Sequence, residues 1–169
     1  MAYKKIVFFS LLLFGLLWAG GPVKLYAQAG STCTNPYIIT TFPFTQTGMT
    51  TCGFADNYTS LDVCGSSYMN GDDFLYQYTP TATQTVSLAL TGTGTWVGLF
   101  VYNGCPSAMG TICISSNTNS SGNPSIGSVT LTAGTTYFFM IDTWPLPQCT
   151  PFNFSMTNPP PPTNQDCQG

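Results

Sequence analysis

The sequence contains no histidine, arginine or glutamate, and its three lysines all lie within the first 24 residues. All six acidic residues are aspartates. Proteins bind nucleic acid through Lys and Arg side chains that contact phosphates, so we exclude nucleic acid as a partner. Hydrolytic enzymes activate a nucleophile with a base such as His, Lys or Glu, and here only Asp is available. The sequence therefore predicts a protein that is not an enzyme.

Two short patterns approach known catalytic arrangements without completing them. Asp142-Thr143-Trp144 resembles the Asp-Thr-Gly of aspartic proteases, but Trp replaces Gly and no second copy supplies the other carboxyl of the dyad. Asp72 and Asp73 could suggest a glycosidase pair. As neighbours in an extended strand, however, they would point to opposite sides.

The N-terminal residues have the order of a secretory signal. Lys4 and Lys5 precede the apolar run 6–19, and Ala27-Gln28-Ala29 follows as a small-x-small cleavage site. The run is shorter than the roughly 20 residues of a membrane-spanning helix, which disfavours an uncleaved anchor. We predict a signal peptide over residues 1–29, with cleavage after Ala27 as the alternative. The mature chain would be secreted or held at the cell surface, with no membrane insertion and a net charge near −6 from six aspartates.

Short apolar or alternating segments separated by Gly, Thr, Asn, Ser and Pro predict an all-β fold. Tyr137–Ile141 is apolar on both faces and should be a central strand, and Ala133-Gly134 before it indicates a tight hairpin. We predict an antiparallel β-sandwich or jelly-roll-like domain over residues 30–157, stapled by disulfides. The predicted strands are Phe74–Thr79, Thr85–Leu90, Trp96–Tyr102, Ile112–Ser115, Ser128–Leu131, Tyr137–Ile141 and Phe152–Met156.

Seven cysteines in an exported chain indicate a disulfide framework with one cysteine left over. A zinc site is disfavoured because there is no histidine and no Cys-x-x-Cys pair. Six cysteines allow 15 pairings, and we favour short closures. The predicted disulfides are Cys105–Cys113, Cys52–Cys64 and Cys33–Cys149.

The last residues, 158–169, differ in composition from the rest. Four consecutive prolines, Pro159 to Pro162, predict an extended polyproline spacer. The sequence around Cys167 echoes that around Cys33, which suggests the start of a second module. The alternative is a free terminus with a spare thiol.

Three segments in order resemble the pre-peptidase C-terminal (PPC-like) β-sandwich modules of secreted Bacteroidota proteins. They are Gly71–Pro80, then Val97–Cys105 followed by Cys113, and Thr130–Phe138 with its Ala-Gly-Thr-Thr-Tyr stretch. The resemblance implies a non-catalytic accessory domain that occurs beside other modules in peptidases, adhesins and surface proteins. It also implies possible calcium binding, since some members bind that ion.

Aspartates in the first half of the domain have two interpretations. They are turn formers and solvated charges, which we favour, or they supply oxygen ligands to one structural calcium ion. No spacing matches the twelve-residue calcium loop, and no other cofactor is predicted. The candidate ligands are Asp56, Asp62, Asp72 and Asp73.

Two tryptophans are candidate ligand-binding residues, because exposed aromatic rings can stack on sugars. Trp144 lies in a stretch with Pro145 and Pro147, a stiff loop suited to such a contact. Trp96 begins a predicted strand, where tryptophan more often packs in the core, so we predict that it is buried.

These observations predict a secreted, non-catalytic binding or spacer module of a modular protein, with an adhesion or accessory role. Its partners would be neighbouring modules, other copies of itself, or an extracellular glycan or protein. Two alternatives remain open. One is a self-assembling filament or surface-layer subunit, favoured by a Thr-rich surface without lysine. The other is a carbohydrate-binding module.

Overall fold

The alternation of apolar and polar residues in the sequence divides the molecule into layers. In the computed structural model, which describes residues 28–161, the strand β4 buries Val86, Leu88 and Leu90 and leaves Thr85 exposed. The nine strands of the described residues are β1 (Tyr37–Ile38), β2 (Phe44–Thr50), β3 (Phe74–Tyr78), β4 (Gln84–Thr91), β5 (Val97–Tyr102), β6 (Cys113–Asn119), β7 (Ser125–Leu131), β8 (Tyr137–Thr143) and β9 (Pro151–Thr157).

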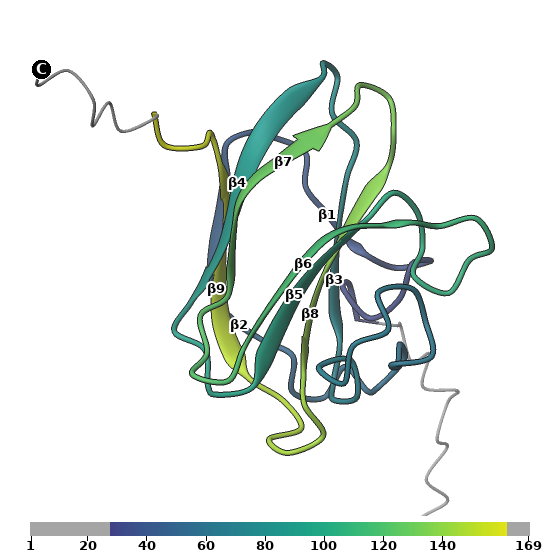
Figure 1. Ribbon diagram of the computed structural model, residues 1–169, viewed down its shortest axis with the longest axis vertical. Coiled ribbons are helices and arrows are strands. Elements are labelled where there is room, and N and C mark those ends of the chain that lie inside the picture. The colour runs from purple at the N-terminus through teal and green to yellow at the C-terminus, as the bar shows by residue number, and fades with distance from the viewer. Residues whose placement is uncertain (1–27, 162–169) are drawn as a thin grey trace, which may run out of the picture.

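The strands form two sheets that pack face to face as a β-sandwich (Figure 1). One sheet has five strands in the order β1-β3-β8-β5-β6, and the other has four in the order β2-β9-β4-β7. All pairs are antiparallel except β1 with β3. The predicted disulfide-stapled, antiparallel β-sandwich is confirmed.

The core between the sheets is rich in aromatic rings. Tyr76 of β3 stacks on Phe154 of β9 with their ring centroids 4.7 Å apart, and Phe139 of β8 lies 6.1 Å from the same Phe154 ring. Every residue of β8 is buried, and β3 and β5 flank this strand. The prediction of a central strand at Tyr137–Ile141 is confirmed.

The seven predicted strands are present, but β1 and β2 were not predicted. In β2 a register shift between Gln46 and Met49 breaks its pairing with β9, and Gly48 has a φ of 70° there. This β-bulge disrupts the alternation of inward and outward residues on which strand prediction depends. β1 has only two residues, too few for any periodicity.

The predicted hairpin at Ala133-Gly134 is wrong. Gly134 has a φ of 75°, so the chain does turn there. However, β7 belongs to the four-stranded sheet and β8 to the five-stranded sheet, so the two strands do not pair. The Gly134 N–H instead donates to Pro80 O, at 2.9 Å. Pro80 lies between β3 and β4, a connection that also crosses from one sheet to the other.

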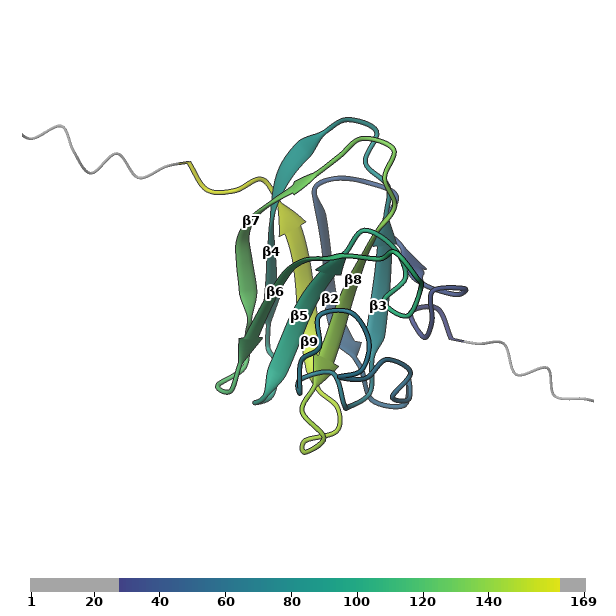
Figure 2. The same cartoon turned by 45° about the vertical axis from the view of Figure 1, so that its right-hand side comes forward.

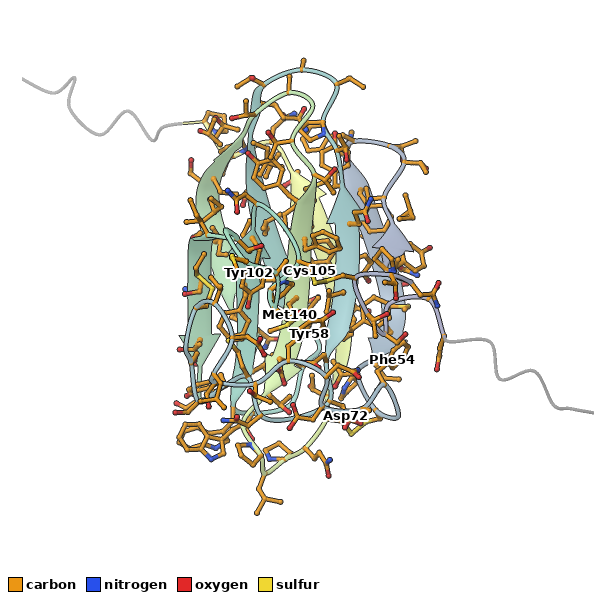
Figure 3. All side chains as sticks on the ribbon, turned by 90° about the vertical axis from the view of Figure 1, so that its right-hand side faces the viewer. Phe54, Tyr58, Asp72, Tyr102, Cys105 and Met140 are labelled. Atoms are coloured by element: carbon orange, nitrogen blue, oxygen red, sulfur yellow. A yellow bond between two sulfur atoms is a disulfide. The ribbon has the colours of Figure 1, made fainter. Side chains whose placement is uncertain are left out.

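A loop over residues 51–73 covers the outer face of the five-stranded sheet (Figures 1 and 2). Beneath it lies a second apolar cluster, in which Tyr58 and Met69 of the loop pack with Tyr102 of β5 and Met140 of β8. Figure 3 looks onto this face, with Tyr58 beside Met140 near its centre. The loop therefore adds a third layer without strands of its own.

The six cysteines predicted to form disulfides do so, but the predicted pairing is wrong. Short closures were expected, whereas every observed bond joins distant segments. The 51–73 loop folds across the sheet, which brings its cysteines to partners far away in sequence. The β5–β6 loop, where a Cys105–Cys113 bond was expected, is closed by hydrogen bonds instead, including Ile112 N–H to Asn103 Oδ1 at 2.7 Å. The disulfides are Cys33–Cys105, Cys52–Cys149 and Cys64–Cys113, with Cα–Cα distances of 5.7, 4.8 and 5.1 Å.

The described chain begins beside the five-stranded sheet and leaves from β9 on the opposite side (Figures 1 and 2). Residues 158–161 have no regular structure. The predicted signal peptide, apart from its last two residues, and residues 162–169 with Cys167 lie outside the described residues. Within residues 28–161, no helix is long and apolar enough to cross a membrane.

Candidate functional site

Both tryptophans of the described residues lie at one end of the sandwich and contact each other. Trp96 precedes β5 and Trp144 follows β8, and the pairing of Val97 with Thr143 brings these neighbours together. Their ring centroids are 5.6 Å apart, and the Trp144 N–H donates to Trp96 O at 3.0 Å. The side chains are 41% and 38% exposed. The β8–β9 loop that begins with Trp144 projects from the lower end of the molecule in Figures 1 and 2.

The prediction that Trp96 is buried in the core is wrong. Trp96 has a φ of 60°, in the left-handed region that residues other than glycine rarely adopt. The strand begins one residue later, at Val97, which is fully buried. The reversed backbone at Trp96 keeps its ring out of the core, and such strain in a non-glycine residue is concentrated at functional sites.

Tyr68, which sequence reasoning did not identify, is the third ring of the group. Its centroid lies 5.9 Å from that of Trp96 and 5.4 Å from that of Trp144. Tyr68 packs over Gly98 of β5, where a Cβ would clash with the Phe100 ring and lie 3.2 Å from Tyr68 Cβ. A glycine inside a strand can mark such a close approach, so Gly98 was the available signal. We call Tyr68, Trp96 and Trp144 the aromatic patch.

The four predicted calcium ligands have separate roles as hydrogen-bond acceptors or surface charges. Asp72 accepts from Gly53 N–H at 2.8 Å, and Asp62 accepts from Thr59 N–H at 2.8 Å within a turn. Asp56 is exposed, and partial burial together with the charges of Asp72 and Asp62 raises its pKa. Among residues 28–161 no three Asp, Glu, His or Cys side chains form a group that could hold a metal ion.

Asp73 instead pairs with Asp142, the residue two positions before Trp144. Both carboxyl groups are fully buried, and they lie close enough for the charge of Asp73 to raise the pKa of Asp142. Asp73 Oδ2 also accepts from Tyr58 N–H at 2.8 Å, and Asp142 Oδ1 accepts from Gly71 N–H at 3.1 Å. Asp73 Oδ1 and Asp142 Oδ2 are buried and have no hydrogen-bond partner. Asp73 therefore fastens the 51–73 loop at Tyr58, and Asp142 of β8 fastens it at Gly71.

Burial, followed by the charge of Asp73, raises the pKa of Asp142 far above its usual value. Burial also raises the pKa of Asp73, to about 7. One proton shared between the facing oxygens satisfies both carboxyl groups, as in a coupled acid pair. A substrate cannot reach either group, because neither has exposed surface. The pair therefore has a structural role, in which its oxygens accept hydrogen bonds from the backbone of the 51–73 loop.

A hollow of about 510 Å³ opens at the end of the sandwich opposite to the aromatic patch. It lies beside β1 and is lined by residues that include Ile38, Phe42, Gln77, Tyr78 and Gln84. Gln84 Nε2 donates to Tyr78 Oη across it, at 2.9 Å. The lining contains no charged side chain, and the hollow shares no residue with the aromatic patch.

The chain matches no protein-family model, no curated protein and no solved structure.

Proposed function

We propose that this protein is a secreted, non-catalytic binding module that recognises its ligand through the aromatic patch. This proposal rests on the observation that the two described tryptophans, which are exposed and come from different loops, form one cluster with the half-buried Tyr68. Exposed tryptophan and tyrosine rings are enriched where proteins bind ligands, because they offer large contact areas at low entropic cost. Loops that cluster at one end of a β-sandwich are a common place for such sites.

Three further observations support this proposal. The three disulfides are typical of extracellular proteins, in agreement with the predicted signal peptide. The acidic pair most like a catalytic dyad is buried, and no His, Lys, Arg or Glu is present in residues 28–161. The described ends leave on opposite sides, which suits a module placed between others, as in the PPC-like family that the sequence resembles.

The experiment is solid-phase binding of the secreted protein to a panel of neutral glycans, acidic glycans, extracellular-matrix proteins and a proline-rich peptide. Trp144→Ala and Tyr68→Ala should lower binding to the recognised member. Leu61→Ala is the matched control, since Leu61 is 95% exposed and outside the patch. Binding that is equal in all variants, or no binding to any panel member, contradicts the proposed function.

A self-assembling subunit is the second candidate, and the edges of the four-stranded sheet favour it. The edge strands β2 and β7 contain no charged residue that would repel another strand. Sedimentation velocity over a wide concentration range tests this directly. A monomer at high concentration rules the candidate out, whereas polymers that dissolve on adding a lysine, as in Thr47→Lys, support it.

A further inference from the structure

The contact distances within the aromatic patch limit how a ligand can use it. The three ring centroids are 5.4 to 5.9 Å apart, so the rings touch and leave no space between them for a ligand group. A cage that encloses a cationic group needs rings that surround an opening. The ligand must therefore lie against the outer surfaces of the rings.

The angles between the rings exclude a flat platform. Trp96 and Tyr68 are inclined by 32°, whereas Trp144 is inclined by 55° to Trp96 and by 83° to Tyr68. Trp96 and Tyr68 thus form one wall of a corner and Trp144 forms the other. A flat crystalline surface can contact only one wall at a time, whereas a single flexible chain can follow both.

The charge around the patch selects against anionic ligands. Residues 28–161 contain no cationic side chain, and Asp142, close to Trp144 in sequence, is buried. The exposed residues beside the rings in sequence are uncharged, namely Ser67, Thr95 and Pro145. Ser120 contributes its carbonyl, which accepts the Trp96 N–H at 3.2 Å, and its side chain is also exposed. Such a rim offers hydrogen bonds to hydroxyl groups and no cationic partner for sulfate or carboxylate.

The backbone holds the rings in place before a ligand arrives. The segments that carry them are joined by hydrogen bonds from Trp144 N–H to Trp96 O, at 3.0 Å, and from Asn70 N–H to Thr143 O, at 3.2 Å. Preorganised side chains lose little entropy on binding, which favours affinity from a small contact area.

We infer that the aromatic patch binds single chains of an uncharged glycan, with sugar rings stacked on Trp96 and Trp144 and with Tyr68 extending the Trp96 wall. This inference rests on the proposed function and names its ligand class. It makes Trp144 a specificity-determining residue, because Trp144 forms the second wall of the corner and gives the site its second direction of contact. Acidic polysaccharides and flat crystalline polysaccharide surfaces are poor ligands.

Tryptophan fluorescence reports on this site selectively. Trp96 and Trp144 are the only tryptophans after Trp18, which lies in the predicted signal peptide. The secreted chain is titrated with soluble cellohexaose, chitohexaose, mannohexaose and laminarihexaose, then with heparin, hyaluronan and a proline-rich peptide. At least one neutral oligosaccharide should shift the emission. Trp144→Ala should weaken its binding by about tenfold or more, as measured by calorimetry, and Tyr68→Ala should also weaken it. Leu61→Ala should bind as the wild type.

Each other outcome has a separate meaning. Binding of only the acidic glycans or only the peptide, lost in Trp144→Ala, overturns the glycan inference and leaves the proposed function standing. Neutral glycan binding that survives Trp144→Ala and Tyr68→Ala overturns both. Stronger retention on microcrystalline cellulose or chitin than on the soluble chains overturns the corner geometry. No response to any probe overturns the inference. Circular dichroism of each variant confirms that it is folded.

Discussion

Asp142→Asn is expected to stabilise the protein at neutral pH and to have little effect near pH 4. Burial raises the pKa of both Asp73 and Asp142 above the ordinary 3.8, so the folded state keeps protons that the unfolded state releases. This contribution to stability is fully present below about pH 4. It is lost as the pH rises toward about 7, where Asp73 ionises, and further toward the higher pKa of Asp142.

The magnitude follows from proton linkage. Each proton kept only by the folded state costs about 1.4 kcal/mol per pH unit. The proton on Asp142 alone therefore lowers the stability by about 4 kcal/mol between pH 5 and pH 8. An asparagine at this position keeps an oxygen for the Gly71 N–H, and its amide donates to the unpartnered Asp73 Oδ1 without needing a proton. The variant should recover most of that loss at pH 8.

The assay is guanidinium unfolding at pH 4 to 8 with the disulfides intact, for the wild type, Asp142→Asn and the double variant with Asp73→Asn. In the double variant each amide oxygen still accepts from its backbone N–H, so the two NH2 groups face each other without an acceptor. The double variant should therefore be less stable than Asp142→Asn. A wild-type stability that stays constant or rises from pH 5 to 8 would refute the shared proton. A double variant as stable as Asp142→Asn would refute the facing geometry.

Three other predictions test the site and its support. Trp96→Gly should be more stable than Trp96→Ala by about 1 kcal/mol in thermal unfolding, because glycine adopts the φ of 60° without strain; equal stabilities would mean that this backbone is unstrained. Replacing Cys64 and Cys113 together by Ala should cost about 2–4 kcal/mol, and should also weaken ligand binding, since Tyr68 lies in the loop that this disulfide fastens. Adding calcium or EDTA should leave the melting temperature unchanged, because the oxygens of Asp72 already accept hydrogen bonds; a higher midpoint with calcium would restore the predicted ion site.

The fold class could be predicted because each strand buries every second side chain. This alternation, together with β-branched and aromatic residues, can be read from a short stretch of sequence. Val86, Leu88 and Leu90 face the core for this reason. The pairing of cysteines could not be predicted, because it depends on the path of a loop that has no periodic pattern. Cys64 can bond to Cys113 only because the 51–73 loop crosses the outer face of the five-stranded sheet.

The aromatic patch was predicted in part. Trp144 was identified from its stiff loop, but Trp96 was assigned to the core, because nothing in the sequence signals a left-handed backbone at a tryptophan. Tyr68 has no neighbouring motif of its own, and only Gly98 across the sheet marks its position. The partnership of Asp73 with Asp142 is a contact between β-strand ends far apart in sequence, which composition and spacing do not encode.

The long 51–73 loop is better explained by the surface it builds than by the connection it makes. Loops of this length without secondary structure are uncommon in compact domains and are usually functional. Two disulfides and the buried acid pair fasten this one. A connection between β2 and β3 needs none of those ties. They hold Tyr68 against Trp96 and Trp144, so two of the three disulfides act on the element that completes the aromatic patch. Replacing residues 66–68 with a glycine-serine link, which keeps the buried Met69, should therefore abolish binding while both sheets remain folded.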